Sequence, residues 1–229
     1  MRVDAKATAE TELAQALATF APDVLLVDLF WAPVVHILPL LRCEAWLLLR
    51  KVPHVWFAGP PGLPFPASAF ARAIAIEPDA TDRATETIDP IVIANREELR
   101  PAGALRSALG VAPGDPLFVV HQAGSPGELS MLAARAAPGA RTFTLLRDDP
   151  APGEDRFFPL CEWLGDADGV VSAAGYNAFW EAQWLGHAER TTFLPFARPI
   201  DDQSWRIRTC SGRTPSDNGA DVLARQLWP

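Results

Sequence analysis

The sequence predicts an α/β fold built on parallel sheets. Short aliphatic runs of strand length recur along the chain, and segments with helical character lie between several of them. Short apolar runs bounded by turn residues are typical of strands that are buried on both faces. Because parallel strands need crossover connections, strands that alternate with helices indicate a parallel sheet.

The individual elements follow from local patterns. Apolar residues recur at helical spacing between Ala9 and Phe20, and Pro22 ends this predicted opening helix. Strands are predicted at residues 24–27, 45–49, 73–76, 91–93, 117–120, 142–146, 169–172 and 192–194. Helices are predicted at residues 34–41, 101–109, 127–136, 177–185 and 204–208. Residues 57–66 are rich in Pro and Gly and predict a surface loop.

Length and composition exclude several classes of protein. The 229 residues suggest one large or two small domains at ~150 residues each. With 49% hydrophobic and 21% charged residues, the chain is neither disordered nor collagen-like. Its 20 Lys and Arg against 28 Asp and Glu give a net charge of −8, which argues against a nucleic-acid partner. We place a domain boundary near residue 94, where the strand and helix spacing becomes more regular.

Cysteine usage and hydropathy predict a cytoplasmic protein. Cys43, Cys161 and Cys210 are widely spaced and odd in number, so they form neither a disulfide framework nor a metal-binding motif. The N-terminus has no signal-peptide pattern. Charged residues interrupt the apolar stretch at 24–49, so we expect buried core. Peripheral contact of residues 34–49 with the inner membrane is the less favoured alternative.

The first candidate site is the segment VVHQAGSPGEL at residues 119–129. A predicted strand ends there, a turn with Gly124 and Gly127 follows, and a helix opens near Pro126 with Ser125 as its N-cap. Backbone N–H groups and the helix dipole at such a junction favour an anion such as a diphosphate. The alternative is that the glycines only permit a tight turn.

The second candidate site is the segment GVVSAAGYNAFWEAQWLG at residues 169–186. The small residues from Ser172 to Gly175 let a ligand approach the backbone, and Asn177 is the predicted N-cap of the next helix. Glu181 lies one turn into that helix. Its carboxylate only accepts hydrogen bonds and suits the vicinal hydroxyls of a ribose, although it can equally act as a favourable partner of the helix dipole.

The third candidate site is the segment FLPFARPIDDQSWR at residues 193–206. It follows a predicted strand and carries Asp201, Asp202 and Gln203 in a loop before a helix. Carboxylate and amide groups at the carboxyl end of a parallel strand can bind sugar hydroxyls. Asp202 has an alternative role as a helix N-cap.

Catalytic and metal-binding residues are less sharply indicated. His121 and Asp28 each end a predicted strand and are the two candidates for a catalytic base, although structural roles are open for both. No His or Cys cluster has metal-ligand spacing. The pair Asp166 and Asp168 precedes a strand, at the sheet edge opposite the predicted ligand site, so a metal-free site is expected.

Taken together, the three segments resemble the C-terminal half of two-lobed nucleotide-sugar glycosyltransferases. They are similar in particular to the bacterial cell-wall N-acetylglucosaminyltransferase and its relatives. The resemblance rests on residues 121–128, on Ser172 to Gly175 with Glu181, and on residues 194–196 with 201–203, and it covers about residues 94–209. It implies a GT-B arrangement, with an acceptor-side Rossmann-like lobe at residues 1–93 and a donor lobe at residues 94–229.

The resemblance also implies roles for individual residues. The diphosphate would lie against two loops, at Gly124, Ser125 and Gly127 and at Ser172, Gly175, Tyr176 and Asn177. Glu181 would hold the ribose, and Gln203 with Asp202, beside Asp201, would meet the donor sugar. The expected protein is a hexosyltransferase that uses a UDP-sugar and no further cofactor. It would transfer a hexosyl or N-acetylhexosaminyl group, with inversion, to an unknown acceptor, with a lipid-linked acceptor as one hypothesis.

The sequence departs from this family at its beginning. The first strand and Gly-rich loop of the N-terminal lobe have no counterpart here, so we expect an incomplete N-terminal lobe. A second hypothesis is therefore a non-catalytic nucleotide-sugar-binding subunit, or a shortened relative that needs a separate N-terminal-lobe partner chain. A nucleotide-sugar epimerase is a third, weaker hypothesis, because acid and base carboxylates for it are not identified.

Overall fold

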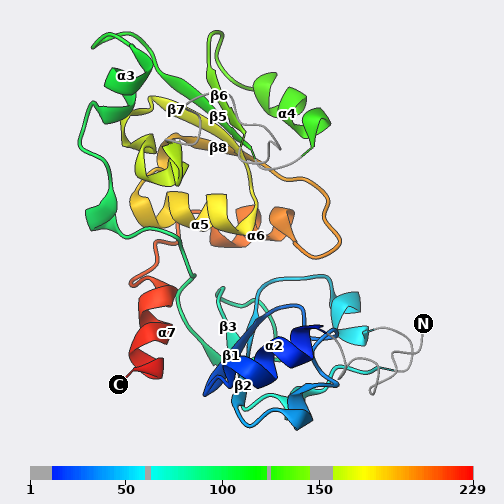
Figure 1. Ribbon diagram of the computed structural model, residues 1–229. Helices are drawn as coiled ribbons and strands as arrows, with labels where there is room; N and C mark the ends of the chain where they lie inside the picture. The colour runs from blue at the N-terminus through cyan, green and yellow to red at the C-terminus, as the bar shows by residue number, and fades with distance from the viewer. Residues whose placement is uncertain (1–11, 60–62, 123–124, 145–156, 229) are drawn as a thin grey trace. The chain divides into compact units, whose positions relative to one another are not determined.

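The computed structural model describes residues 12–59, 63–122, 125–144 and 157–228 (Figure 1). The chain forms two compact units. The first unit comprises Met1–Asp89, Pro199–Asp201 and Asp221–Pro229, and the second comprises Pro90–Arg198 and Asp202–Ala220. This division falls four residues before the predicted boundary, which was set after residue 93, and it assigns residues 221–229 to the first unit rather than to the predicted donor lobe.

The first unit contains a parallel sheet in the order β1-β2-β3-β4. The strands are β1 (Val24–Asp28), β2 (Glu44–Leu49), β3 (Arg72–Ala75) and the short β4 (Glu86–Thr87). Its helices are α2 (Glu12–Phe20) and the 3-10 turns η1 (Leu38–Leu40), η2 (His54–Ala58) and η3 (Ala67–Ala69). Every residue of β2 after Glu44 is apolar and buried, as expected for a strand that is covered on both faces. The core gathers around Leu29, Leu47 and Leu49.

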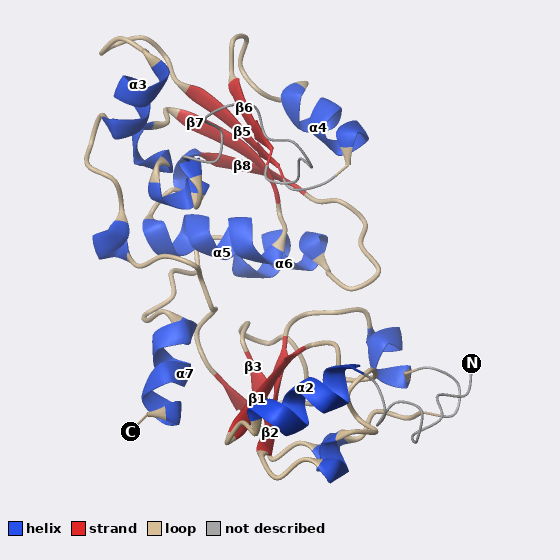
Figure 2. Cartoon of the chain, viewed as in Figure 1, coloured by secondary structure: helices blue, strands red, loops and turns tan. Residues whose placement is uncertain are grey.

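The second unit contains a parallel sheet in the order β6-β5-β7-β8 (Figure 2). The strands are β5 (Phe118–Gln122), β6 (Arg141–Thr144), β7 (Gly169–Ala173) and β8 (Thr191–Leu194). The helices are α3 (Ala104–Leu109), α4 (Pro126–Ala133), α5 (Tyr176–Leu185) and α6 (Gln203–Cys210), with 3-10 turns η4 (Arg96–Glu98), η6 (Leu160–Glu162), η7 (Leu164–Asp166) and η8 (Ala188–Arg190). Helix α7 (Gly219–Leu227) begins among the second unit's residues and ends among those of the first.

Both faces of the second sheet are covered. Val119 and Val170 pack into one apolar cluster with Leu105 of α3 and with η6 and η7. Their chain neighbours Val120 and Val171 pack into another cluster with Leu132 of α4. Successive strand residues point to opposite faces, so continuous aliphatic runs are required where both faces are buried. The α/β class with Rossmann-like parallel sheets is thereby confirmed.

Most of the predicted elements are confirmed, and two are wrong. Residues 34–41 form turns and the short η1 instead of a helix, since Pro33 and Pro39 interrupt the helical spacing. Residues 91–93 are not a strand. The amide of Ile91 donates to the Tyr176 hydroxyl at 2.8 Å, and that of Val92 to the Asn218 side chain at 3.3 Å, so side chains satisfy this backbone. The predicted strand at 142–146 ends at Thr144, beyond which it lies outside the described residues.

No helix in the described parts of the chain combines the length and the apolar character needed to cross a membrane.

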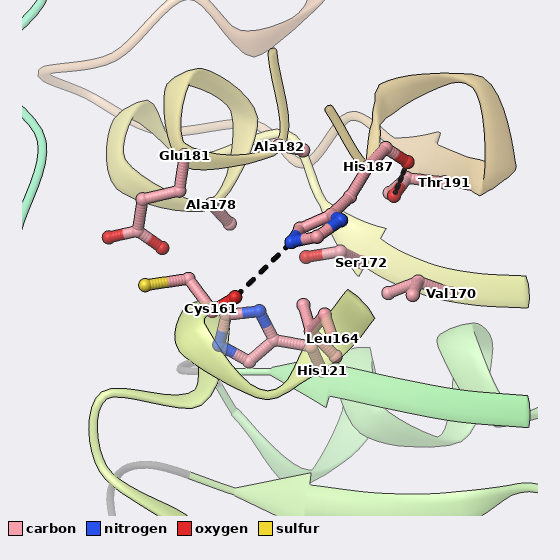
Figure 3. A pocket seen from close by; sticks show the side chains of 10 residues that line it. All are labelled: His121, Cys161, Leu164, Val170, Ser172, Ala178, Glu181, Ala182, His187 and Thr191. Atoms are coloured by element: carbon pink, nitrogen blue, oxygen red, sulfur yellow. Dashed lines mark hydrogen bonds between the residues drawn. The ribbon is translucent and has the colours of Figure 1, made fainter. Parts of the chain in front are cut away.

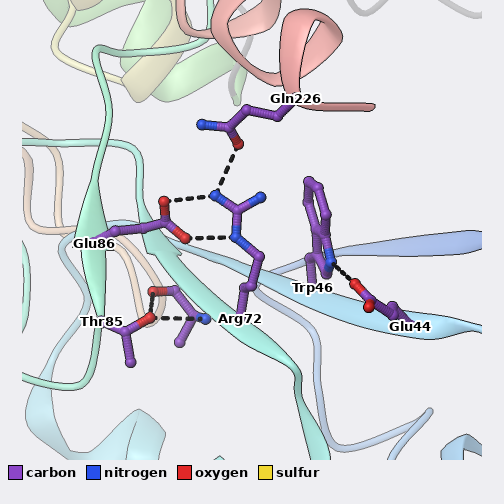
Figure 4. A network of polar contacts seen from close by, with 7 residues as sticks. Glu44, Trp46, Arg72, Thr85, Glu86 and Gln226 are labelled. Carbon is purple, nitrogen blue, oxygen red and sulfur yellow. Dashed lines mark hydrogen bonds and ion pairs between the residues drawn. The ribbon is translucent and has the colours of Figure 1, made fainter. Parts of the chain in front are cut away.

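Arg72 joins three elements of the first unit (Figure 4). Its guanidinium donates to both carboxylate oxygens of Glu86 on β4 at 2.7 and 2.6 Å, and to the amide oxygen of Gln226 in α7 at 2.8 Å. The same guanidinium lies 4.1 Å from the ring centroid of Trp46 on β2. A bidentate pair stacked on an aromatic ring uses the planar geometry that distinguishes Arg from Lys.

We therefore expect Arg72→Ala to lower the free energy of unfolding by about 2 kcal/mol, because Glu86 loses a charge-assisted partner. Arg72→Lys should recover only part of this loss. Urea denaturation measures both, with Arg42→Ala, at an exposed site of the same unit, as the control. Equal stability of the Arg72→Ala and Arg42→Ala variants would contradict the assignment.

Candidate functional site

The second sheet has a change of direction in its strand order between β5 and β7. From β5 the chain goes to β6 on one side and then returns to β7 on the other. In open parallel sheets, the crevice at the carboxyl ends of two such strands is the usual ligand site. His121 at the end of β5 pairs in register with Ser172 of β7, which pairs with Phe193 of β8. The three segments singled out in the sequence therefore follow three neighbouring strands.

The junction between β5 and α4 is capped by its own side chains. Ser125 is the N-cap, its hydroxyl accepts from the amide of Glu128, and the Glu128 carboxylate accepts from the amide of Ser125. Pro126 is the first helical residue, so the predicted N-cap and helix start are confirmed. Gly127 is exposed in the first turn. Gly124 lies outside the described residues.

A bidentate ion pair lies at the start of α4. The guanidinium of Arg198 donates to the two carboxylate oxygens of Glu128 at 2.5 and 2.7 Å. Arg198 follows β8 along the chain, so it brings the third segment to the first. The sequence alone does not indicate a role for Arg198, because a partner 70 residues away leaves no local pattern.

At the junction between β7 and α5, the N-cap residue makes no side-chain hydrogen bond to the helix. Gly175 is the N-cap and makes no side-chain cap hydrogen bond, and the helix begins at Tyr176. The prediction that Asn177 caps this helix is therefore wrong; Asn177 is an exposed residue of the first turn. The Tyr176 hydroxyl is used by the amide of Ile91, so a diphosphate contact at Tyr176 would rest on its backbone N–H.

Residues of the third segment contribute to packing as well as to the candidate site. Asp202 is confirmed as the N-cap of α6, where its carboxylate accepts from the amide of Trp205 at 2.9 Å. Gln203 is buried, and its side-chain oxygen accepts from the amide of Phe196 at 2.9 Å. The side-chain nitrogen of Gln203 faces Gly175: a Cβ added to this glycine would lie 4.0 Å from it. Asp201 belongs to the first unit.

A small cavity lies beneath the strand ends, between β5, β7, η6 and α5 (Figure 3). Its volume is ≈ 10 Å³. Four titratable side chains line it: His121, Cys161, Glu181 and His187. Burial raises the pKa of Glu181 to about 7. Hydrogen bonding to the Cys161 thiol lowers the same pKa, but by less than burial raises it. At neutral pH this carboxyl group therefore exists in both protonation states.

The comparisons with solved structures agree with this architecture. Over 97% of the chain, the structure is similar to that of the spinosyn rhamnosyltransferase SpnG, with a TM-score of 0.54, 18% sequence identity and 70% of that chain covered. The same enzyme complexed with thymidine diphosphate gives a TM-score of 0.49 at the same identity and coverage. MurG from Acinetobacter baumannii gives 0.46, with 13% identity, 94% of this chain and 67% of that chain covered. No protein-family model and no curated protein matches the sequence.

The chain has the GT-B glycosyltransferase fold. At 18% identity the similarity is one of fold. It agrees with the expectation drawn from the three segments of the sequence.

Within this GT-B fold, the two candidates for a catalytic base lie in different units. His121 is only 7% exposed, and burial lowers its pKa to about 4, so its imidazole is neutral at pH 7. Asp28 is exposed at the carboxyl end of β1, where Arg50 donates to its two oxygens at 3.3 and 3.1 Å. The catalytic role of either residue stays a prediction.

The acidic pair before β7 has a structural role. Asp166 accepts from the amides of Gly103 and Leu105 at the start of α3, at 2.6 and 2.8 Å. Asp168 accepts from Arg106 and from the amide of Leu117, both at 2.7 Å. These bonds fasten α3 to the amino edge of the sheet. Among the described residues, no group of three or more His, Cys, Asp or Glu side chains could hold a metal ion.

The protonation of Glu181 predicts a pH-dependent stability difference. The pKa of Glu181 is about 7 in the folded chain against 4.5 without burial, so the ionised form costs the folded state free energy as pH rises from 4.5 through 7. Glu181→Gln removes this cost and should raise the free energy of unfolding by up to about 3 kcal/mol at pH 8. At pH 5 the difference should fall to about 1 kcal/mol or less, because Glu181 is then protonated in the folded state and only partly ionised in the unfolded state.

Urea denaturation of the nucleotide-free protein at pH 5 and pH 8 measures the effect. Glu189→Gln, at an exposed site in η8, is the control and should show no such pH dependence. If the free energies of unfolding of Glu181→Gln and wild type differ by the same amount at both pH values, the shifted pKa of Glu181 is contradicted.

Proposed function

We propose that the chain is a glycosyltransferase-type protein whose second unit binds a nucleotide-sugar donor at the carboxyl ends of β5, β7 and β8. The observation that carries the proposal is the position of the three segments. They follow neighbouring strands at the change in strand order, with His121, Ser172 and Phe193 in one row. The fold that the chain shares with a rhamnosyltransferase supports a glycosyltransferase-type function.

The start of α5 is the better diphosphate site of the two helix junctions. Gly175 leaves the first N–H groups of this ten-residue helix without a side-chain cap, whereas Ser125 and Glu128 already cap α4. An anion at α5 would meet N–H donors and the positive end of the helix dipole. At α4 it would meet the carboxylate of Glu128, although the guanidinium of Arg198 lies beside it. The diphosphate is therefore proposed to contact the first N–H groups of α5.

The nucleoside and sugar are assigned to the flanking side chains. Glu181 in its ionised form accepts hydrogen bonds from the two ribose hydroxyls. Gln203 lies beside Gly175, and Asp202 precedes it, so the donor sugar is proposed to meet these two residues. We propose UDP as the nucleotide, a hexosyl or N-acetylhexosaminyl group as the transferred sugar, and no metal ion, since the first N–H groups of α5 supply partial positive charge.

The proposed reaction is a direct displacement with inversion. An acceptor hydroxyl oxygen forms a bond to the anomeric carbon while the bond from that carbon to the diphosphate oxygen breaks. The hydroxyl proton passes to a base, and the departing diphosphate carries the electron pair. Helix dipoles aimed at the departing group act where charge accumulates in the transition state. Asp28 and His121 are the two candidates for this base, and burial lowers the pKa of His121 to about 4, so His121 is a weaker base than an ordinary imidazole.

Calorimetric titration of the purified chain with UDP, TDP and UDP-sugars tests donor binding. TDP is included because it is the nucleotide in the rhamnosyltransferase complex. Glu181→Ala should weaken nucleotide binding about tenfold, because two hydrogen bonds to a carboxylate are lost. Gly175→Val should weaken it at least as much, because its side chain stands where the diphosphate approaches the backbone.

A matched glycine controls for the effect of added side-chain volume. Gly165, in η7, precedes β7 at the opposite edge of the sheet, and an added Cβ there meets nothing within 4 Å. Gly165→Val should therefore bind nucleotide as the wild type does. Absence of nucleotide binding to the folded chain, or equal effects of Gly175→Val and Gly165→Val, would contradict the proposal.

A further inference from the structure

The cavity beneath the strand ends contains a buried polar cluster with an unsatisfied group. The Nε2 atom of His121 is buried and has no hydrogen-bond partner among the described residues, and the whole residue is 7% exposed. The imidazole lines the cavity together with Cys161 and Glu181 (Figure 3). A buried polar atom without a hydrogen-bond partner lowers the stability of the folded state, and this Nε2 atom lies in the same cavity as a carboxyl group. The polar groups of this cavity are therefore candidates for a functional role.

Cys161 faces Glu181 across this cavity. The two residues come from η6 and α5, and the thiol points toward the carboxyl group in Figure 3. Cys161 is 2% exposed and Glu181 9% exposed, so the contact is shielded from water. Burial and the nearby Glu181 and Glu162 carboxylates raise the pKa of the Cys161 thiol well above its usual range. The thiol therefore stays protonated and can donate to Glu181.

The other charged groups around the cavity have partners elsewhere. The Nε2 atom of His187 lies 3.3 Å from the carbonyl oxygen of Cys161, and Arg190 lies 2.8 Å from the Nδ1 atom of the same ring. Glu162 forms an ion pair with Arg100 at 2.9 Å. Within the described parts of the chain, Glu181 forms no ion pair. The hydroxyls of Ser172 and Thr191, which also line the cavity, donate to the carbonyl oxygens of Ala173 and His187. Cys161 and His121 are thus the polar groups of the cavity left to interact with the Glu181 carboxyl.

We propose that Cys161 is a positioning residue for Glu181: its thiol holds this carboxyl group in the orientation and protonation state in which it receives the nucleotide. The inference rests on the proposed function of Glu181 as the ribose-binding carboxylate. The ionised carboxylate offers one oxygen as an acceptor to each ribose hydroxyl and forms the stronger, charge-assisted hydrogen bonds. The thiol stabilises the ionised form against burial, so nucleotide affinity depends on pH through this pair.

The pH dependence has a definite direction. With a Glu181 pKa of about 7, the ionised fraction rises about tenfold between pH 6 and pH 8, and affinity for UDP should rise by about the same factor. Cys161→Val removes the donor at similar volume and should move this rise to higher pH. Cys161→Ser keeps a donor, so the rise in affinity should occur at the same pH as in wild type or at a lower pH.

The titration of Glu181 is measured without any ligand by carbon-13 NMR of labelled glutamate side chains, with the Glu181→Gln spectrum as the assignment. The account predicts a higher Glu181 pKa in Cys161→Val than in wild type, and a pKa at or below the wild-type value in Cys161→Ser. Cys210→Val, at a buried cysteine of α6 outside the cavity, is the control and should leave the titration unchanged.

Calorimetry with UDP at pH 6, 7 and 8 on the same proteins gives the second readout. An unchanged Glu181 titration in a folded Cys161→Val protein overturns the positioning role. Should Cys161→Val not fold, Cys161→Ala takes its place in both measurements. Failure of all proteins to bind UDP at every pH contradicts the proposed function instead, while the ligand-free titration still decides the role of Cys161.

Discussion

The strand β5 lies between β6 and β7 and hydrogen-bonds to both as a parallel partner. Because the chain turns to opposite sides of β5 in successive crossovers, the loops after β5 and β7 diverge and leave room at their carboxyl ends. The register that sets His121 opposite Ser172 also sets Ser172 opposite Phe193. Everything proposed for the second unit depends on this row, since it brings segments up to 72 positions apart in the sequence to one edge of the sheet.

The polar groups at this edge divide into those that hold the fold and those left for a ligand. Ser125 and Glu128 accept hydrogen bonds from backbone amides at the start of α4. The Gln203 side chain accepts from the amide of Phe196, just after β8. The start of α5 is different, because Gly175 offers no side chain to its first N–H groups. Beneath it, Glu181 is buried without an ion pair among the described residues, which is costly for folding and typical of a functional carboxylate.

Local patterns allowed much of the fold to be predicted. Aliphatic runs marked the strands because both sheet faces are covered, and Ser125 and Asp202 were recognisable as N-caps from their position before a helix. Long-range pairing was not predictable in this way. Nothing near residues 91–93 indicates that Tyr176 and Asn218 take up their amides, and the partnership of Arg198 with Glu128 joins two distant loops. The proximity of Cys161 to Glu181 likewise required the tertiary structure.

Hydrogen exchange of the backbone amides, followed with and without saturating UDP, tests most directly whether the nucleotide binds at the carboxyl edge of the second sheet. The account predicts slower exchange on UDP addition at the first turn of α5, at residues 176–178, and little change in β1, β2 and β3 of the first unit. Protection confined to the first unit, or no change at α5 under conditions where UDP is bound, would contradict it.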